Sequence, residues 1–456
     1  MIKLFTQNTI VLVFLLMPYM AQSQWQQQTT LNGSPPVTHM IAIDENILWI
    51  CTLNGYAYRS TDGGQNWQQS TQVTSNESIF SIAAIDSMKA FVCGGNLMPP
   101  YGNAKIYRTT DGGQSWDTVY TAIGAVTFWN LIHFFDAQNG IAMSDPPNSG
   151  QPFVIVKTTD SGQNWTQISN PPTPNPNELG MISSFQFFDE MNGWFGTNNG
   201  GRIFRTTDGG QNWTGYPSGN TNGRIYSVNF VSPTTGVRAC NASPFLTRTT
   251  DGGQSWTPVV NFPVSNITGL GRGTVASTML RSQIWVYGEA STAPTPFMIT
   301  STDSGQTWQQ QTLPDLSGEG IGALTAAVFG DSVRVWAATI KPVTYDSGGQ
   351  ILTYADIISS VNERSTTITS DYRLEQNYPN PFNPITTIEF DLPKSSEVSL
   401  KIFNILGEEV STLVSDRLSA GSYSYDWDAS NLASGVYLYR LETEGFVEIK
   451  KMILMK

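Results

Sequence analysis

RTTDGGQNW, residues 205–213, decides the fold, because five near copies of this stretch occur elsewhere in the chain. The other copies are RSTDGGQNW (59–67), RTTDGGQSW (108–116), KTTDSGQNW (157–165), RTTDGGQSW (248–256) and TSTDSGQTW (300–308). Their aspartates lie 43 to 52 residues apart and are Asp62, Asp111, Asp160, Asp208, Asp251 and Asp303. Repeats of this length with strand-like sequence between them predict the sheets of a β-propeller rather than helical repeats.

Each copy reads as a hairpin turn. The pattern Ser/Thr-x-Asp-x-Gly lets the carboxylate accept hydrogen bonds from backbone N–H groups two or three residues further on. The glycine supplies a positive φ, and the tryptophan starts the next strand and packs between neighbouring sheets. We therefore expect the six aspartates to be structural rather than catalytic.

The sequence between the copies predicts four strands per unit. The second strands of the units align on one apolar residue each. These alignment residues are Trp49, Phe91, Ile141, Trp194, Val237, Trp285 and Trp336. They give seven units, one more than the number of turns. The fold class is therefore all-β. A propeller of seven blades is the prediction, and six blades is the alternative.

The extra unit has no tryptophan-led fourth strand of its own. The stretch WQQQT at residues 25–29 repeats WQQQT at 308–312, the fourth strand of the sixth unit. We expect residues 24–30 to complete the last sheet beside a strand near 350–357, which places the propeller at 24–357. Such closure removes exposed sheet edges.

The first 23 residues have the features of a signal peptide. Lys3 precedes the apolar run 10–17, and small residues stand at both ends of Ala21-Gln22-Ser23. We expect cleavage after Ser23, with no membrane-spanning segment in the mature chain. A membrane anchor is the alternative, but the run is short for a span.

A polar stretch at 358–372 reads as a linker, and the sequence changes character after it. Alternating apolar residues broken by Gly, Pro and Asn predict a small immunoglobulin-like β-sandwich at 373–456. Its opening Asn377–Pro384 (NYPNPFNP), Ile402-Phe403-Asn404 with Gly407, and Ala433–Tyr437 (ASGVY) closely resemble the type A sorting domain of type IX (Por) secretion in Bacteroidetes-like bacteria. The resemblance implies export through the periplasm by that machinery, which reads residues 373–456, to the outer-membrane surface or the medium.

The repeated turn itself resembles the Asp-box (BNR) repeat. Propellers with this repeat include sialidases, other glycosidases, sortilin-type receptors and photosystem assembly factors of the Ycf48/HCF136 kind, and the closely spaced DGGQ-x-W turns most resemble the last group. The Arg-Ile-Pro signature of sialidases is absent; Arg202-Ile203-Phe204 is the nearest sequence. Arginines before the turns, such as Arg59 and Arg205, are repeat residues rather than a triad that binds a carboxylate.

Two functions from different classes remain open. The first is a non-enzymatic exported propeller that binds a protein or glycan through the face opposite the Asp-boxes. The second is a secreted glycoside hydrolase or lyase, which requires two carboxylates across a cleft. Acidic candidates for that face are Asp145, Glu178, Glu289 and Glu319, and aromatic candidates for sugar stacking are Tyr101 and Trp129.

Composition excludes other classes. The net charge of −12 disfavours nucleic acid as a partner. His39 and His133 lie on predicted first strands without a nucleophile in recognisable context, and the cysteines Cys51, Cys93 and Cys240 read as small buried residues. A disulfide between Cys51 and Cys93 remains an alternative. Nothing is spaced like a zinc or calcium site, so we expect no metal and no cofactor.

Overall fold

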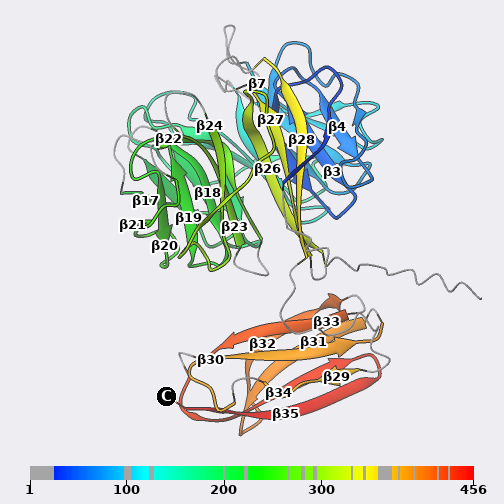
Figure 1. Cartoon of the computed structure of the whole chain (residues 1–456), viewed down its shortest axis with the longest axis vertical. Helices are drawn as coiled ribbons and strands as arrows, with labels where there is room; N and C mark the ends of the chain where they lie inside the picture. Colours follow the sequence, from blue (N-terminus) through cyan, green and yellow to red (C-terminus); the bar gives the residue numbers. More distant parts are fainter. Residues whose placement is uncertain are drawn as a thin grey trace, which may run out of the picture. The chain divides into compact units, whose positions relative to one another are not determined.

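The computed structural model describes residues 25–96, 104–122, 128–198, 201–219, 224–264, 267–278, 283–290, 295–329, 332–341, 346–357, 372–377, 380–394, 396–418, 421–429 and 432–455. These residues form strands and turns and contain no helix, so they offer no helix that could cross a membrane. The chain divides into two compact units, Met1–Ile358 and Ser359–Lys456 (Figure 1). The predicted signal peptide lies outside the described residues.

The described part of the first unit forms seven four-stranded antiparallel sheets in chain order. The first two sheets are β2 (Val37–Ala42), β3 (Leu48–Thr52), β4 (Ala57–Ser60), β5 (Gln68–Gln69), and β6 (Ser78–Ala84), β7 (Ala90–Gly95), β8 (Lys105–Thr109), β9 (Asp117–Thr121). The next two are β10 (Trp129–Phe134), β11 (Gly140–Ser144), β12 (Val154–Thr158), β13 (Thr166–Gln167), and β14 (Gly180–Phe187), β15 (Gly193–Thr197), β16 (Arg202–Thr206), β17 (Thr214–Pro217). Two more are β18 (Ile225–Phe230), β19 (Gly236–Cys240), β20 (Leu246–Thr249), β21 (Thr257–Pro258), and β22 (Ile267–Thr278), β23 (Gln283–Ala290), β24 (Thr295–Ser301), β25 (Gln309–Gln311).

The last sheet combines both ends of the unit. Its order is β1 (Gln26–Thr30), β28 (Gly348–Ile357), β27 (Ser332–Ile340) and β26 (Gly320–Phe329). Strand β1 pairs antiparallel with β28, with Gln26 opposite Thr353 and Thr30 opposite Gln350. The predicted closure of the ring by the N-terminal segment is confirmed.

The core lies between neighbouring sheets and is built from the second strands. All seven alignment residues lie on second strands, namely β3, β7, β11, β15, β19, β23 and β27, and each is at most 2% exposed. The indole N–H of Trp336 donates to the carbonyl of Gly63 at 3.0 Å, and that of Trp194 to Gly252 at 2.9 Å. Trp336 and Trp194 thus each bind the Asp-box turn of a different unit and tie neighbouring sheets together.

The Asp-box at 205–213 shows how the turn is built. The hydroxyl of Thr206 donates to Asp208 Oδ1 at 2.8 Å and accepts the N–H of Gly210 at 2.9 Å. Asp208 Oδ1 also accepts the N–H groups of Gln211 and Asn212, at 3.0 and 2.9 Å. The expected bond from the residue three positions on is confirmed, whereas the second backbone N–H comes from the residue four positions on rather than two. Gly210 has a φ of 83°, which favours glycine.

The second unit is a β-sandwich of two sheets. One holds β29 (Arg373–Leu374), β30 (Ile385–Leu392) and β33 (Gly421–Asp428), and the other holds β32 (Glu409–Leu418), β31 (Ser396–Asn404), β34 (Gly435–Thr443) and β35 (Phe446–Leu454). The opening motif covers part of the edge of β35. The Phe382 N–H donates to the Ile453 carbonyl at 2.9 Å, and Asn380 Oδ1 accepts the Ile453 N–H at 2.9 Å. Covering an edge strand in this way prevents its pairing with another chain.

Candidate functional site

The four acidic candidates occupy two repeated positions. Asp145 and Glu289 each follow the second-strand alignment residue of their unit by four positions, whereas Glu178 and Glu319 stand just before first strands. In these antiparallel sheets, the end of the second strand and the start of the first lie at the opposite end from the Asp-boxes. The candidates therefore lie at the end of the sheets opposite the Asp-boxes.

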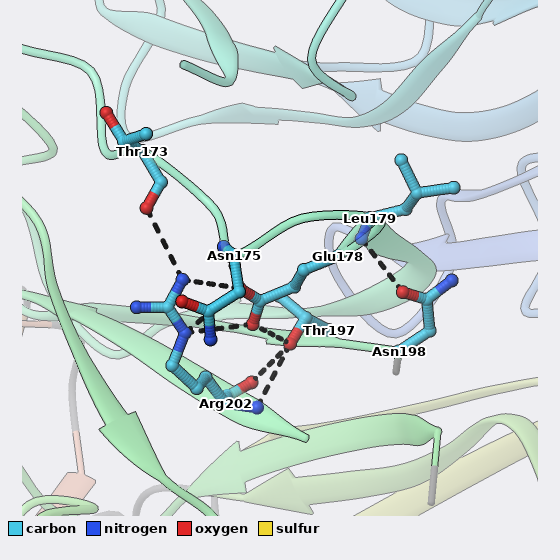
Figure 2. Close-up of polar contacts among 7 residues, drawn as sticks. All are labelled: Thr173, Asn175, Glu178, Leu179, Thr197, Asn198 and Arg202. Atoms are coloured by element: carbon cyan, nitrogen blue, oxygen red, sulfur yellow. Dashed lines mark hydrogen bonds and ion pairs between the residues drawn. The ribbon is translucent and has the colours of Figure 1, made fainter. Parts of the chain in front are cut away.

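Glu178 is 1% exposed. Several residues around it hold its carboxylate (Figure 2). Its Oε1 accepts the Thr197 hydroxyl at 2.7 Å, and its Oε2 accepts the Asn175 N–H at 2.8 Å. The guanidinium of Arg202 approaches from β16; its Nε lies 3.0 Å from both carboxylate oxygens, and its Nη2 forms an ion pair with Oε2. Both oxygens of this carboxylate are thus engaged by the protein itself.

The same network positions the connector that leads into β14. Arg202 Nη2 also donates to the Thr173 carbonyl at 3.3 Å, and Asn198 Oδ1 accepts the Leu179 N–H at 2.8 Å (Figure 2). Two charged side chains and one amide thus fix a segment that precedes the strand. The network therefore holds the loop that leads into β14 in place.

Asp145 joins the same segment from the preceding unit. Its Oδ1 accepts the side-chain amide of Asn130 at 2.9 Å and the N–H of Gly180 at 2.7 Å. Burial raises the pKa of this carboxyl to about 6, although these two hydrogen bonds oppose the shift. The structure therefore connects Asp145 and Glu178 to one connector, 175–180, between the sheets of the third and fourth units.

Glu319 lies in the last unit and is not part of this group. Its Oε2 accepts the Thr339 hydroxyl at 2.6 Å and the Gln350 amide at 2.9 Å. Thr339 stands at the position of Thr197, because each follows its alignment tryptophan by three residues. Glu178 and Glu319 thus repeat one structural device in two units.

Glu77 occupies the same position in the second unit, although its sequence gave no reason to single it out. It precedes β6 and accepts the hydroxyl of Tyr107 at 2.8 Å. In each of these three units, the residue three positions after the alignment residue pairs with a residue of the first strand. The glutamate stands two residues before that first-strand residue. These pairs are Ile79 with Gly94, Gly180 with Thr197, and Ile321 with Thr339. Bulges in the first strands change the number of residues between the glutamate and the alignment residue. The three glutamates are therefore recognised as equivalent from the strand pairing and not from sequence spacing.

The remaining candidates are Glu289, Tyr101 and Trp129. Glu289 lies on β23 with its Cα opposite Gly269 and Pro296, and its side chain lies outside the described residues, as does all of Tyr101. Trp129 is 0% exposed and packs on Tyr120 with ring centroids 5.8 Å apart. The prediction that Trp129 stacks on a sugar is wrong, because its ring belongs to the core and offers no free face.

Both histidines lie on first strands, as predicted. The Nδ1 of His39 accepts the N–H of Ile82 at 3.1 Å, and the ring of His133 stacks on Phe187 at 5.2 Å between centroids. Phe185 lies near both, at 6.2 Å from His39 and 6.4 Å from His133. Burial lowers both imidazole pKa values to about 4, so both rings are neutral at pH 7.

All three cysteines are buried and none forms a disulfide, so Cys51 and Cys93 are not bridged. Burial raises the pKa of the Cys51 thiol to about 12 and holds that of Cys93 well above its ordinary value, so neither is a thiolate nucleophile. Over the described ranges, no group of three or more His, Cys, Asp or Glu side chains could hold a metal ion.

Comparisons with known proteins agree with both units. Residues 376–455 match the model of the secretion system C-terminal sorting domain, residues 102–221 that of the photosynthesis system II assembly factor YCF48, and residues 58–69 the BNR/Asp-box repeat. This chain is an Asp-box propeller protein with a C-terminal secretion sorting domain. The sorting domain indicates export by type IX secretion to the cell surface or the medium.

Solved structures share the propeller fold. A structure of YCF48 bound to D1 peptide has a TM-score of 0.51 at 18% identity and covers 73% of this chain and 97% of its own. YCF48 from Cyanidioschyzon merolae gives 0.52 at 17%, covering 73% and 99%. The GH74 xyloglucanase from Xanthomonas campestris gives 0.52 at 15%, covering 70% of this chain and 53% of its own. A comparison with curated protein sequences finds no match.

Proposed function

We propose that this Asp-box propeller protein is a non-catalytic binding protein of the cell surface or the medium. It takes an extracellular protein or glycan on the face opposite the Asp-boxes, after its sorting domain has directed it out of the cell. The sorting domain's partner is the type IX secretion machinery, and the propeller's partner is the ligand.

The state of the carboxylates carries this proposal. Glu178, Asp145 and Glu319 all accept hydrogen bonds from the protein's own side chains or backbone. A glycoside hydrolase needs one carboxyl group that reaches the leaving oxygen and a second that reaches water or the sugar. Carboxylates that fix connectors instead make the loops of this face rigid, which lowers the entropy lost on binding a ligand.

The fold neighbours support binding as a use of this propeller. One of them is YCF48 bound to a peptide, and its chain and ours align over almost its whole length. Fold alone does not carry function, so the peptide of YCF48 is not proposed as the ligand here.

The test uses the full chain and a panel of plant, algal and host polysaccharides. Released sugars and the shift in melting temperature are measured in the same samples. A melting-temperature shift without released sugars supports a binding protein. If neither changes, crosslinking of the exported protein on intact cells should give one specific adduct; with no adduct as well, the proposal fails.

A hydrolase is the second candidate, and one observation favours it. The pKa of Asp145 is raised to about 6, which is the range of a general acid at neutral pH. Released sugars that disappear in Asp145→Asn would establish this function and overturn the first.

A further inference from the structure

A groove of about 610 Å³ opens beside the sixth unit, outside the site described above. Gln310 and Gln311 of β25 line one part of it, and the connector 312–318 lines most of the rest. This connector joins a fourth strand to the next first strand, so the groove lies toward the end opposite the Asp-boxes.

The groove lies where β25 leaves its sheet. Strand β24 runs from Thr295 to Ser301, but β25 pairs only with Met298–Thr300. Continued pairing would place Leu313 opposite Pro296, and Pro296 has no N–H to donate. The connector turns away at this point, and Pro296 forms part of the groove lining.

The connector is held rigidly. Asp315 Oδ1 accepts the Ser317 N–H at 2.9 Å, and the Leu316 carbonyl accepts the Glu319 N–H at 3.0 Å and the Gln350 amide at 3.2 Å. Leu316 itself is 3% exposed and packs into the core. A groove whose wall is fixed before binding loses little entropy when a ligand enters.

The lining chemistry selects the ligand class. The described lining residues offer two side-chain amides, the Thr312 hydroxyl and one carboxylate, Asp315, beside the apolar surfaces of Pro296, Leu313 and Pro314; none of them is cationic. Amides both donate and accept, as sugar hydroxyls do. An anionic ligand would meet a carboxylate without a compensating charge. We infer that this groove binds a neutral oligosaccharide, which deepens the proposed function and rests on it.

The chain contains its own control for this inference. WQQQT occurs at 25–29 as well as at 308–312, and register places Gln27 in β1 at the position of Gln310 in β25. Gln27 is exposed, donates to Thr30 Oγ1 at 3.1 Å, and lies in the next sheet. Gln27 therefore matches Gln310 in its neighbouring sequence, in its position on the fourth strand and in its exposure, but it does not line the groove. This makes Gln27→Ala the control for Gln310→Ala.

The experiment measures binding of the full chain to cellohexaose, xylohexaose, mannohexaose and maltohexaose by calorimetry, with hexagalacturonate as the charged comparison. We expect at least one neutral hexasaccharide to bind. Gln310→Ala and Asp315→Asn should each weaken it about tenfold, whereas Gln27→Ala leaves it unchanged. Melting curves of all variants report folding, and Asp315→Asn keeps the oxygen that accepts the Ser317 N–H.

Three results would overturn the inference. They are no binding of any neutral hexasaccharide, equal or tighter binding of hexagalacturonate, and an effect of Gln27→Ala as large as that of Gln310→Ala. If Gln310→Ala still binds polysaccharide as tightly as wild type, the groove is ruled out as the binding site. The proposed binding function would remain.

Discussion

The ring of Trp25 lies against that of Tyr354, with centroids 5.6 Å apart, and joins the two ends of the propeller. Trp25 is 2% exposed and belongs to the core between the sixth sheet and the closing sheet, together with Trp285 and Leu316. Strand β1 follows directly and supplies the outer strand of the closing sheet.

Trp25→Ala should therefore destabilise the propeller by about 3–5 kcal/mol, the usual cost of removing a buried aromatic side chain. Denaturant unfolding of the full chain measures the change. Trp25→Phe keeps an apolar ring and should lose clearly less. Equal stability of Trp25→Ala and wild type would show that the ring does not depend on this contact.

Thr206→Val tests the Asp-box. Valine keeps the shape of the side chain but leaves the buried N–H of Gly210 without its acceptor. An orphaned buried donor costs about 1–3 kcal/mol. The exposed Thr214→Val on the neighbouring strand is the control and should change the melting temperature little.

Glu178→Gln should destabilise the chain by about 2–3 kcal/mol, because it removes the negative partner of Arg202 and hydrogen bonds to a charged group. Arg202→Met should cost a similar amount. The double variant should cost less than the sum of the two, because each single change leaves the other charge unpaired. Additive costs would contradict a coupled clamp.

Acid should destabilise the propeller in two separate ranges of pH. The imidazoles of His39 and His133 have folded pKa values near 4, below the ordinary 6.5, so the unfolded chain binds more protons between these values. Stability should be fully present above pH 6.5 and fall as the pH decreases toward 4. In His133→Phe this slope should be less steep, as measured by melting at fixed ionic strength; Asp145, whose folded pKa is raised to about 6, contributes a slope of opposite sign below that pH in both proteins.

The second range belongs to the Asp-boxes. Hydrogen bonds from Ser115 and Thr109 hold the pKa of Asp111 at about 2, and those from Asn164 and Thr158 do the same for Asp160. These groups contribute stability above the unfolded pKa near 3.8, and it is lost as the pH falls toward 2. Asp111→Asn should reduce the loss of stability between pH 3.8 and 2, and leave the loss between pH 6.5 and 4 unchanged.

Much of the fold follows from the sequence because local chemistry repeats. The turn from Thr206 to Trp213 needs no distant contact to form its hydrogen bonds, so six copies predict six turns. The closing strand was also predictable, since residues 25–29 repeat the fourth strand at 308–312.

The candidate site was less predictable, because burial is a property of the assembled sheets. Trp129 follows a stretch with no strong strand signal and could have been a loop aromatic, but it starts β10 in the core. The partner of Glu178 is Arg202, which lies on β16 two strands further along the chain and whose sequence context suggests only a comparison with sialidases. Neither relation has a fixed spacing in the sequence.

The pairing of β1 with β28 also sets an order of events during synthesis. The ribosome makes residues 26–30 long before their partners at 350–353, so this segment stays unpaired while almost the whole propeller is made. Contacts between residues so distant in the chain form slowly. Until they form, the edge of β28 and the free segment are both open to pairing with another chain, so the newly made protein is most exposed to aggregation at the step that completes it.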